Sequence, residues 1–129
     1  MPKPIVFSII ESALHPKLSG LYDELGYEEL QFNSIRKTLA ALKKNKPDVI
    51  VAEFFYAFGT NYASNHICNL DTLLITLQKY PDYQPKLIIM VSKREYEFVS
   101  KLEGHYDFQY NADYVLAQPV SEAQIRALI

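Results

Sequence analysis

Short apolar runs alternate along the chain with longer segments whose apolar residues recur every three or four positions. The first run, 5–10, is continuous except for Ser8, and its length and β-branched residues are typical of a strand buried on both faces. The other expected strands lie at 29–32, 48–55, 87–91 and 114–117. Such alternation favours parallel strands joined by right-handed crossovers, with helices on both faces. The sequence therefore predicts an α/β fold with a five-stranded, doubly wound parallel sheet.

Five helices are expected, one after each strand. The first contains a stripe spaced by four, three and four residues, made of Leu14, Leu18, Leu21 and Leu25. Gly26 is expected to end it, and Ser34 to be the N-cap of the second helix.

The remaining three helices are expected in the second half of the chain. Asn69 is the expected N-cap of the third, and Tyr96, Val99 and Leu102 indicate a fourth that is expected to stop near Gly104. Ser121 and Gln124 fit a capping box that opens the last helix.

Length and composition indicate one globular domain that spans 1–129, alone or as the N-terminal part of a longer protein. Apolar residues make up 49% of the 129 positions and charged residues 22%, and the formal net charge of −2 argues against direct nucleic-acid binding. There is no run of about 20 apolar residues and no signal-peptide pattern, so we expect a cytoplasmic protein without membrane contact. Cys68 is the only cysteine, which excludes a disulfide framework and a cysteine zinc site.

Polar residues follow several of the expected strands at the point where each ends. Glu11 and Ser12 follow the first, Glu53 lies within the third, and Ser92 and Gln118 follow the fourth and fifth. Since sites in open α/β sheets lie beyond the carboxyl ends of the strands, we expect these residues on one rim. Glu53 is unusual because a buried acid is costly unless something pairs with it.

The order of elements resembles the receiver domain of bacterial response regulators along the whole chain. The resemblance is carried by KPDVIVAEF at 46–54, LIIMVS at 87–92 and ADYVLAQPV at 112–120. It implies a CheY-like sheet with strand order 2-1-3-4-5. It also implies a phosphoacceptor aspartate after the third strand, an acid pair that binds magnesium after the first, a hydroxyl after the fourth and a lysine after the fifth.

This sequence departs from that pattern at most of these positions. Glu53 stands at the phosphoacceptor position, and the acid pair falls on Ile10 and Glu11, or one residue earlier. Gln118 replaces the lysine, and Ser92 alone matches. With the metal pair and the lysine missing, phosphoryl transfer to Glu53 has lost its main electrostatic support. We therefore expect no phosphorylation, no catalytic residues and no cofactor; a weak magnesium site at Glu11 and Glu53 is not favoured.

Two interpretations of Glu53 stay open at this point. In the first, its longer side chain imitates a phosphoaspartate and locks an active-like state, with Lys93 as the nearest candidate partner cation. In the second, Glu53 remains solvated at the rim and has no role.

Aromatic residues gather after Glu53 and before the fifth strand. The candidate interface residues are Phe54, Phe55, Tyr56, Phe58, Tyr110 and Tyr114. Tyrosine is favoured at protein interfaces, although simple packing is an equal alternative.

The leading functional hypothesis is a pseudo-receiver that is not an enzyme and acts in a bacterial signalling pathway by binding a protein partner, by forming a homodimer, or both. The first alternative is a divergent receiver that still accepts a phosphoryl group in a two-component system. The second is a small-molecule binder on a flavodoxin-like fold.

Overall fold

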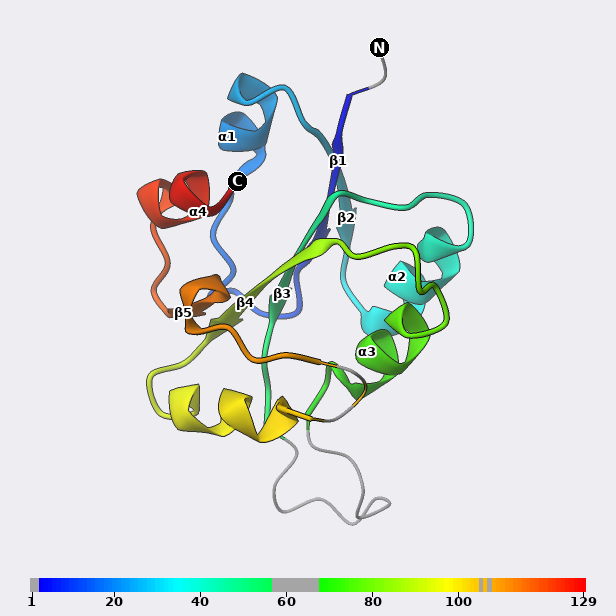
Figure 1. Ribbon diagram of the computed structural model, residues 1–129. Helices are drawn as coiled ribbons and strands as arrows, with labels where there is room; N and C mark the ends of the chain where they lie inside the picture. Colours follow the sequence, from blue (N-terminus) through cyan, green and yellow to red (C-terminus); the bar gives the residue numbers. More distant parts are fainter. Residues whose placement is uncertain (1–2, 57–67, 105, 107) are drawn as a thin grey trace.

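The computed structural model describes residues 3–56, 68–104, 106 and 108–129. Its centre is one sheet of five parallel strands in the order β2-β1-β3-β4-β5, which confirms the predicted fold and strand order (Figure 1). The strands are β1 Ile5–Ile9, β2 Glu28–Phe32, β3 Val49–Glu53, β4 Lys86–Val91 and β5 Val115–Ala117. All four pairings between neighbouring strands are parallel, so every strand ends at the same edge of the sheet.

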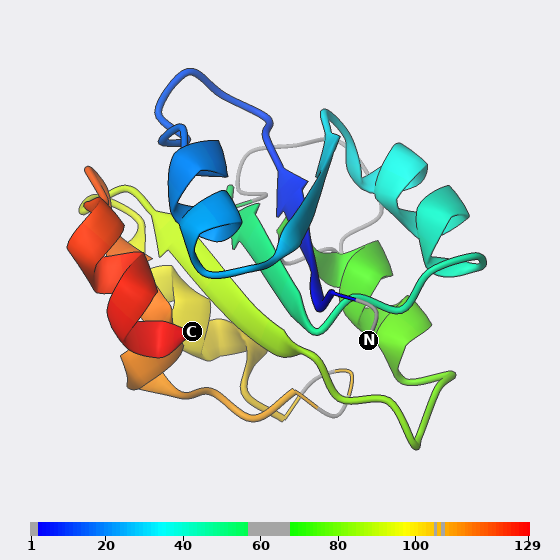
Figure 2. The same ribbon diagram turned by 90° about the horizontal axis from the view of Figure 1, so that it is seen from above.

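Helical elements cover both faces of the sheet (Figures 1 and 2). The elements are α1 Ser19–Glu24, α2 Ile35–Leu42, α3 Asp71–Leu77, α4 Glu122–Leu128 and the 3-10 helices η1 Tyr96–Leu102 and η2 Ala112–Tyr114. The buried residues of α2, α3 and η1 share one apolar cluster, and those of α1 and α4 share a second. The sheet thus separates two cores, as expected for a doubly wound fold.

Three of the predicted helices differ from the structure. The first begins at Ser19, and Leu14 is 61% exposed in the loop before it, because Pro16 disfavours helical backbone at the residue ahead of it. The fourth is the seven-residue 3-10 helix η1. The N-cap of α3 is Leu70 rather than Asn69, whose side chain has a different role described below.

The other predicted helix signals are confirmed. Ser34 is the N-cap of α2, and its side chain accepts a hydrogen bond from the Lys37 amide. Ser121 and Gln124 form the capping box of α4, and Gly26 follows α1 with a φ of 81°. No helix in the described part of the chain is long and apolar enough to cross a membrane.

The strand β3 lies in the middle of the sheet, and all five of its residues are buried. Its last residue, Glu53, therefore enters the protein interior at the carboxyl edge of the sheet. Phe54, which follows it, is only 1% exposed and belongs to the core. The prediction that Phe54 takes part in an exposed interface is wrong.

Candidate functional site

The site is centred on the carboxylate of Glu53, a side chain that is 1% exposed. One carboxylate oxygen accepts hydrogen bonds from the backbone amides of Glu11 and Ser12, both at 3.0 Å. The other accepts a short hydrogen bond from the Ser12 hydroxyl and one from the Gln118 amide at 3.3 Å. Four donors from two loops thus surround a single acid and satisfy the hydrogen-bonding capacity of its buried oxygens.

Neither of the two interpretations of Glu53 describes this environment fully. Glu53 is not solvated at the rim, so that prediction is wrong. The suggested partnership with Lys93 is also wrong: the ion pairs found in the described residues involve Arg126, and Lys93 is exposed. The acid is compensated by amide and hydroxyl dipoles instead of a cation, which satisfies the requirement that a buried polar group be paired.

Asn69 ties the start of the third helical segment to the end of β3. Its side-chain nitrogen donates to the backbone oxygen of Glu53 at 2.8 Å and to the Glu11 carboxylate at 2.9 Å. Its side-chain oxygen accepts from the Phe55 amide at 2.7 Å. Asn69 is therefore part of the site. From the sequence, it was expected only as a helix cap.

The acid-pair position provides one carboxylate rather than two. Ile10 is a half-buried apolar residue, and its backbone amide donates to the Phe32 oxygen at 2.7 Å. Burial raises the pKa of Glu11, the Asn69 hydrogen bond opposes this, and the nearby Glu53 carboxylate raises the pKa further. Within the described ranges, there is no group of three or more His, Cys, Asp and Glu side chains placed to hold a metal ion.

The remaining predicted site residues lie at the same edge of the sheet. Gln118 follows β5 and is buried, and its side-chain nitrogen donates to the Glu53 carboxylate past the end of β4. The Gln118–Pro119 peptide bond is cis. The Ser92 hydroxyl accepts a hydrogen bond from the Glu95 amide at 3.3 Å. The structure thus brings Glu11, Ser12, Glu53 and Gln118 together. Ser92 instead bonds within the turn that follows β4.

The predicted interface residues are divided between core and surface. Phe55 is 39% exposed, whereas Tyr56 is half-buried and stacks on Phe98 with ring centroids 4.3 Å apart. Tyr110 and Tyr114 are half-buried against the two apolar clusters. Phe58 lies outside the described residues.

Comparison with known proteins gives a match in structure but not in sequence. No family model matches the chain, and no curated protein matches it. The beryllofluoride-activated NtrC receiver domain, solved in solution, aligns over 100% of this chain and 93% of its own with a TM-score of 0.57 and 17% identity. The chain has the fold of a response-regulator receiver domain.

A second solved structure supports this conclusion. It is a response regulator from Burkholderia pseudomallei, crystallised with a phosphorylated aspartic acid, a calcium ion and citrate. It covers 96% of this chain with a TM-score of 0.58 and 17% identity, and this chain spans 65% of its length. Since identity is low in both cases, the likeness establishes the fold and leaves activity to be argued from the site.

Proposed function

We propose that this chain is a pseudo-receiver: a signalling module that acts through protein contacts and not through phosphoryl transfer. The observation that carries the proposal is the saturation of the Glu53 carboxylate by the Glu11 and Ser12 amides, the Ser12 hydroxyl and the Gln118 side chain. A carboxylate oxygen that attacks phosphorus must be free to approach it, and these donors would first have to be displaced.

The surrounding charges also oppose phosphoryl transfer. The resemblance to receivers implies a metal and a lysine that neutralise the transferred group. Here Ile10 provides no ligand, Gln118 is uncharged, and the carboxylate of Glu11 already accepts a hydrogen bond from Asn69. A phosphoryl group would enter beside two carboxylates that form no ion pair with any cation in the described part of the chain, which is electrostatically unfavourable.

The rim of the same site supports a contact function. Leu14 is 61% exposed and Phe55 is 39% exposed, and these are two of the three large apolar side chains most exposed in the described chain. Both belong to the hydrogen-bonded network around Glu53: the Leu14 amide donates to the Ser12 hydroxyl oxygen at 3.2 Å, and the Phe55 amide donates to Asn69. The Glu53 network therefore fixes the backbone of two exposed apolar residues, and in this proposal their side chains contact a protein partner in a bacterial signalling pathway or a second copy of the chain.

The test is the intact mass of the protein after incubation with acetyl phosphate and magnesium. We expect the mass to stay unchanged. A gain of one phosphoryl group in the natural protein that is absent in Glu53→Gln would overturn the proposal, because it would identify Glu53 as a working acceptor.

The homodimer form of the proposal is tested by sedimentation over a range of protein concentrations. We expect self-association that is weakened in the Leu14→Ser, Phe55→Ser double variant. The matched control is Ile75→Ser, which removes an apolar side chain of similar exposure, 38%, from α3. An equal effect of both changes would contradict a contact at the Glu53 rim.

A further inference from the structure

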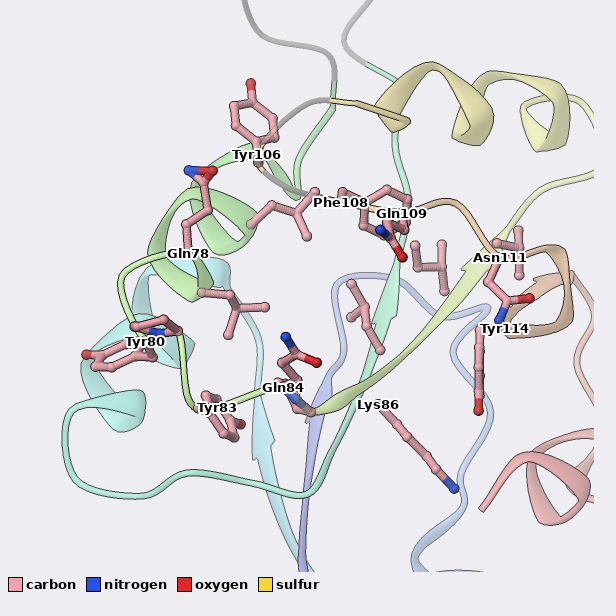
Figure 3. Close-up of a pocket in the computed structure, with 17 residues that line it drawn as sticks. Gln78, Tyr80, Tyr83, Gln84, Lys86, Tyr106, Phe108, Gln109, Asn111 and Tyr114 are labelled. Carbon is pink, nitrogen blue, oxygen red and sulfur yellow. The ribbon is translucent and has the colours of Figure 1, made fainter.

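A concave feature lies at the opposite end of the sheet from Glu53. It is a hollow of about 690 Å³ between the end of α3, the start of β4 and the segment that leads into β5 (Figure 3). We call it the aromatic hollow, after the five aromatic residues that help line it, Tyr80, Tyr83, Tyr106, Phe108 and Tyr114. Its volume falls within the range of about 300–1,000 Å³ that small-molecule sites occupy.

The aromatic hollow exists because the fourth helical element is short. The 3-10 helix η1 ends at Leu102, and Gly104 turns the chain with a φ of 82°. The Gly104 amide donates to the Phe108 oxygen at 3.2 Å, so the chain returns without forming another helical turn. Leu87 and Ile89 of β4 and Val115 of β5 form part of the lining.

The aromatic side of the hollow is held in place by other contacts. The Tyr83 hydroxyl donates to the Pro47 oxygen at 2.5 Å, and the Tyr80 and Tyr83 rings meet edge to face at 6.4 Å. The Lys46 ammonium lies 4.3 Å from the centre of the Tyr80 ring. Rings that are fixed before binding lose little entropy when a flat ligand packs against them.

Two uncharged amides face the middle of the hollow. Figure 3 shows the side chains of Gln84 and Gln109 on opposite sides of the hollow with their amide groups turned toward its middle. Neither amide forms a hydrogen bond with another described residue, so both keep a donor and an acceptor for a ligand.

Charge is nearly absent from the lining. No carboxylate is found among the described residues that line the hollow, and the one cation, Lys86, donates from its ammonium to the Leu128 oxygen at 3.0 Å. A cationic ligand would therefore lack a partner here, and Figure 3 shows the Lys86 ammonium directed away from the middle of the hollow. The chemistry favours a neutral ligand.

We propose that the aromatic hollow binds a small, uncharged, planar heteroaromatic molecule of the nucleobase class, with hydrogen-bond donors and acceptors along its edge. The rings provide the stacking surfaces, and Gln84 and Gln109 pair with the edge. This site is independent of the Glu53 network and of the function proposed above, so either can fail without the other.

The test is a titration of the ¹⁵N-labelled protein with adenosine, followed by the amide resonances. We expect resonances of residues 77–87 and 108–115 to move, while those of Glu11, Ser12 and Gln118 stay in place. Ribose, which lacks the heteroaromatic ring, should move none of them. The proposal is overturned if adenosine at millimolar concentration moves no resonance, or if it moves only those around Glu53.

Variants of the two amides sharpen the result. Gln84→Ala and Gln109→Ala each remove one edge contact and should weaken adenosine binding about five-fold, with a larger loss in the double variant. Lys79→Ala and Asp82→Ala change exposed residues that do not line the hollow and should bind normally. If the double variant is folded and binds adenosine with unchanged affinity, the two amides do not contact the ligand, and the proposal is contradicted.

Discussion

At the scale of single residues, hydrogen-bond donors rather than cations compensate the burial of the Glu53 carboxylate. The carboxylate is buried, and two backbone amides, a hydroxyl and a carboxamide point at it. Hydrogen bonds to a charged group contribute roughly 1.5–3 kcal/mol each when the group is otherwise desolvated. Glu53 therefore joins the β1–α1 loop to the end of β5 and stabilises the fold in addition to any role in signalling.

Glu53→Gln tests this structural role. The variant keeps the shape of the side chain, but it loses the charge and places an NH₂ group where Gln118 donates. We expect a loss of about 2 kcal/mol in the free energy of unfolding, measured by urea denaturation. Glu97→Gln makes the same change at an exposed position in η1 and should leave stability unchanged. Equal stability of both variants would contradict the account.

Glu11→Gln tests the acid beside Glu53 through pH. Because the pKa of Glu11 is raised in the folded protein, the folded state holds the Glu11 proton more tightly than the unfolded state does. The natural protein therefore loses stability as pH rises from below the ordinary glutamate pKa through this raised pKa, and Glu11→Gln avoids that loss.

We expect Glu11→Gln and the natural protein to differ little in urea unfolding at about pH 3.5, and the variant to be more stable at about pH 7. The gain should be less than about 1 kcal/mol, because water screens the partly exposed Glu11. A gain at low pH only would have the wrong sign for a raised pKa.

The sequence predicted where Glu53 lies, but not what surrounds it. A residue's place at a strand end follows from the pattern of apolar runs, so the convergence of Glu11, Glu53 and Gln118 was predictable. The donors were not, because two of them are backbone amides that carry no side-chain signal. Lys93 was the nearest candidate cation in sequence, yet an exposed lysine loses hydration and side-chain entropy if it is drawn inward.

At the scale of elements, the link between β3 and α3 depends on Asn69. Its side chain contacts Glu11, Glu53 and Phe55, which are brought together from two loops. Sequence reasoning assigned Asn69 to a helix cap because asparagine favours that position, and the capping preference gave no indication of these longer-range contacts. The short first helix and the 3-10 form of η1 were missed for a similar reason: apolar spacing predicts which face is buried better than it predicts where a helix begins or which type it adopts.

Asn69→Asp tests the hydrogen bonds that this side chain donates separately from the one that it accepts. The variant keeps the oxygen that accepts from Phe55, loses both donated hydrogen bonds and adds a charge beside the Glu11 carboxylate. We expect a loss of about 2 kcal/mol in unfolding free energy. Asn33→Asp is the matched control at an exposed position outside the site. Destabilisation of similar size in both variants would show that Asn69 has no special role.

At the scale of the whole molecule, the fold and strand order followed from the alternation of strands and helices and from the resemblance to receivers. The central strands are continuously apolar because side chains pack against both faces of the sheet. The aromatic hollow was not predictable, since it arises from the length of η1 and the return of the chain after Gly104. The two ends of the sheet therefore differ in chemistry. At one end the buried Glu53 carboxylate accepts hydrogen bonds from four donors, and at the other the aromatic hollow is open and lined by uncharged side chains apart from Lys86.

The most direct test of the central claim follows the amide resonances of Glu11 and Ser12, the backbone donors to Glu53, in the ¹⁵N-labelled protein. Magnesium and beryllofluoride, which together imitate a phosphoryl group bound to a carboxylate, are added in excess. The account predicts that both resonances, and those of the Gln118 side chain, stay where they are because Glu53 remains bonded to its internal donors. Movement of these resonances that requires both additives and is absent in Glu53→Gln would contradict it.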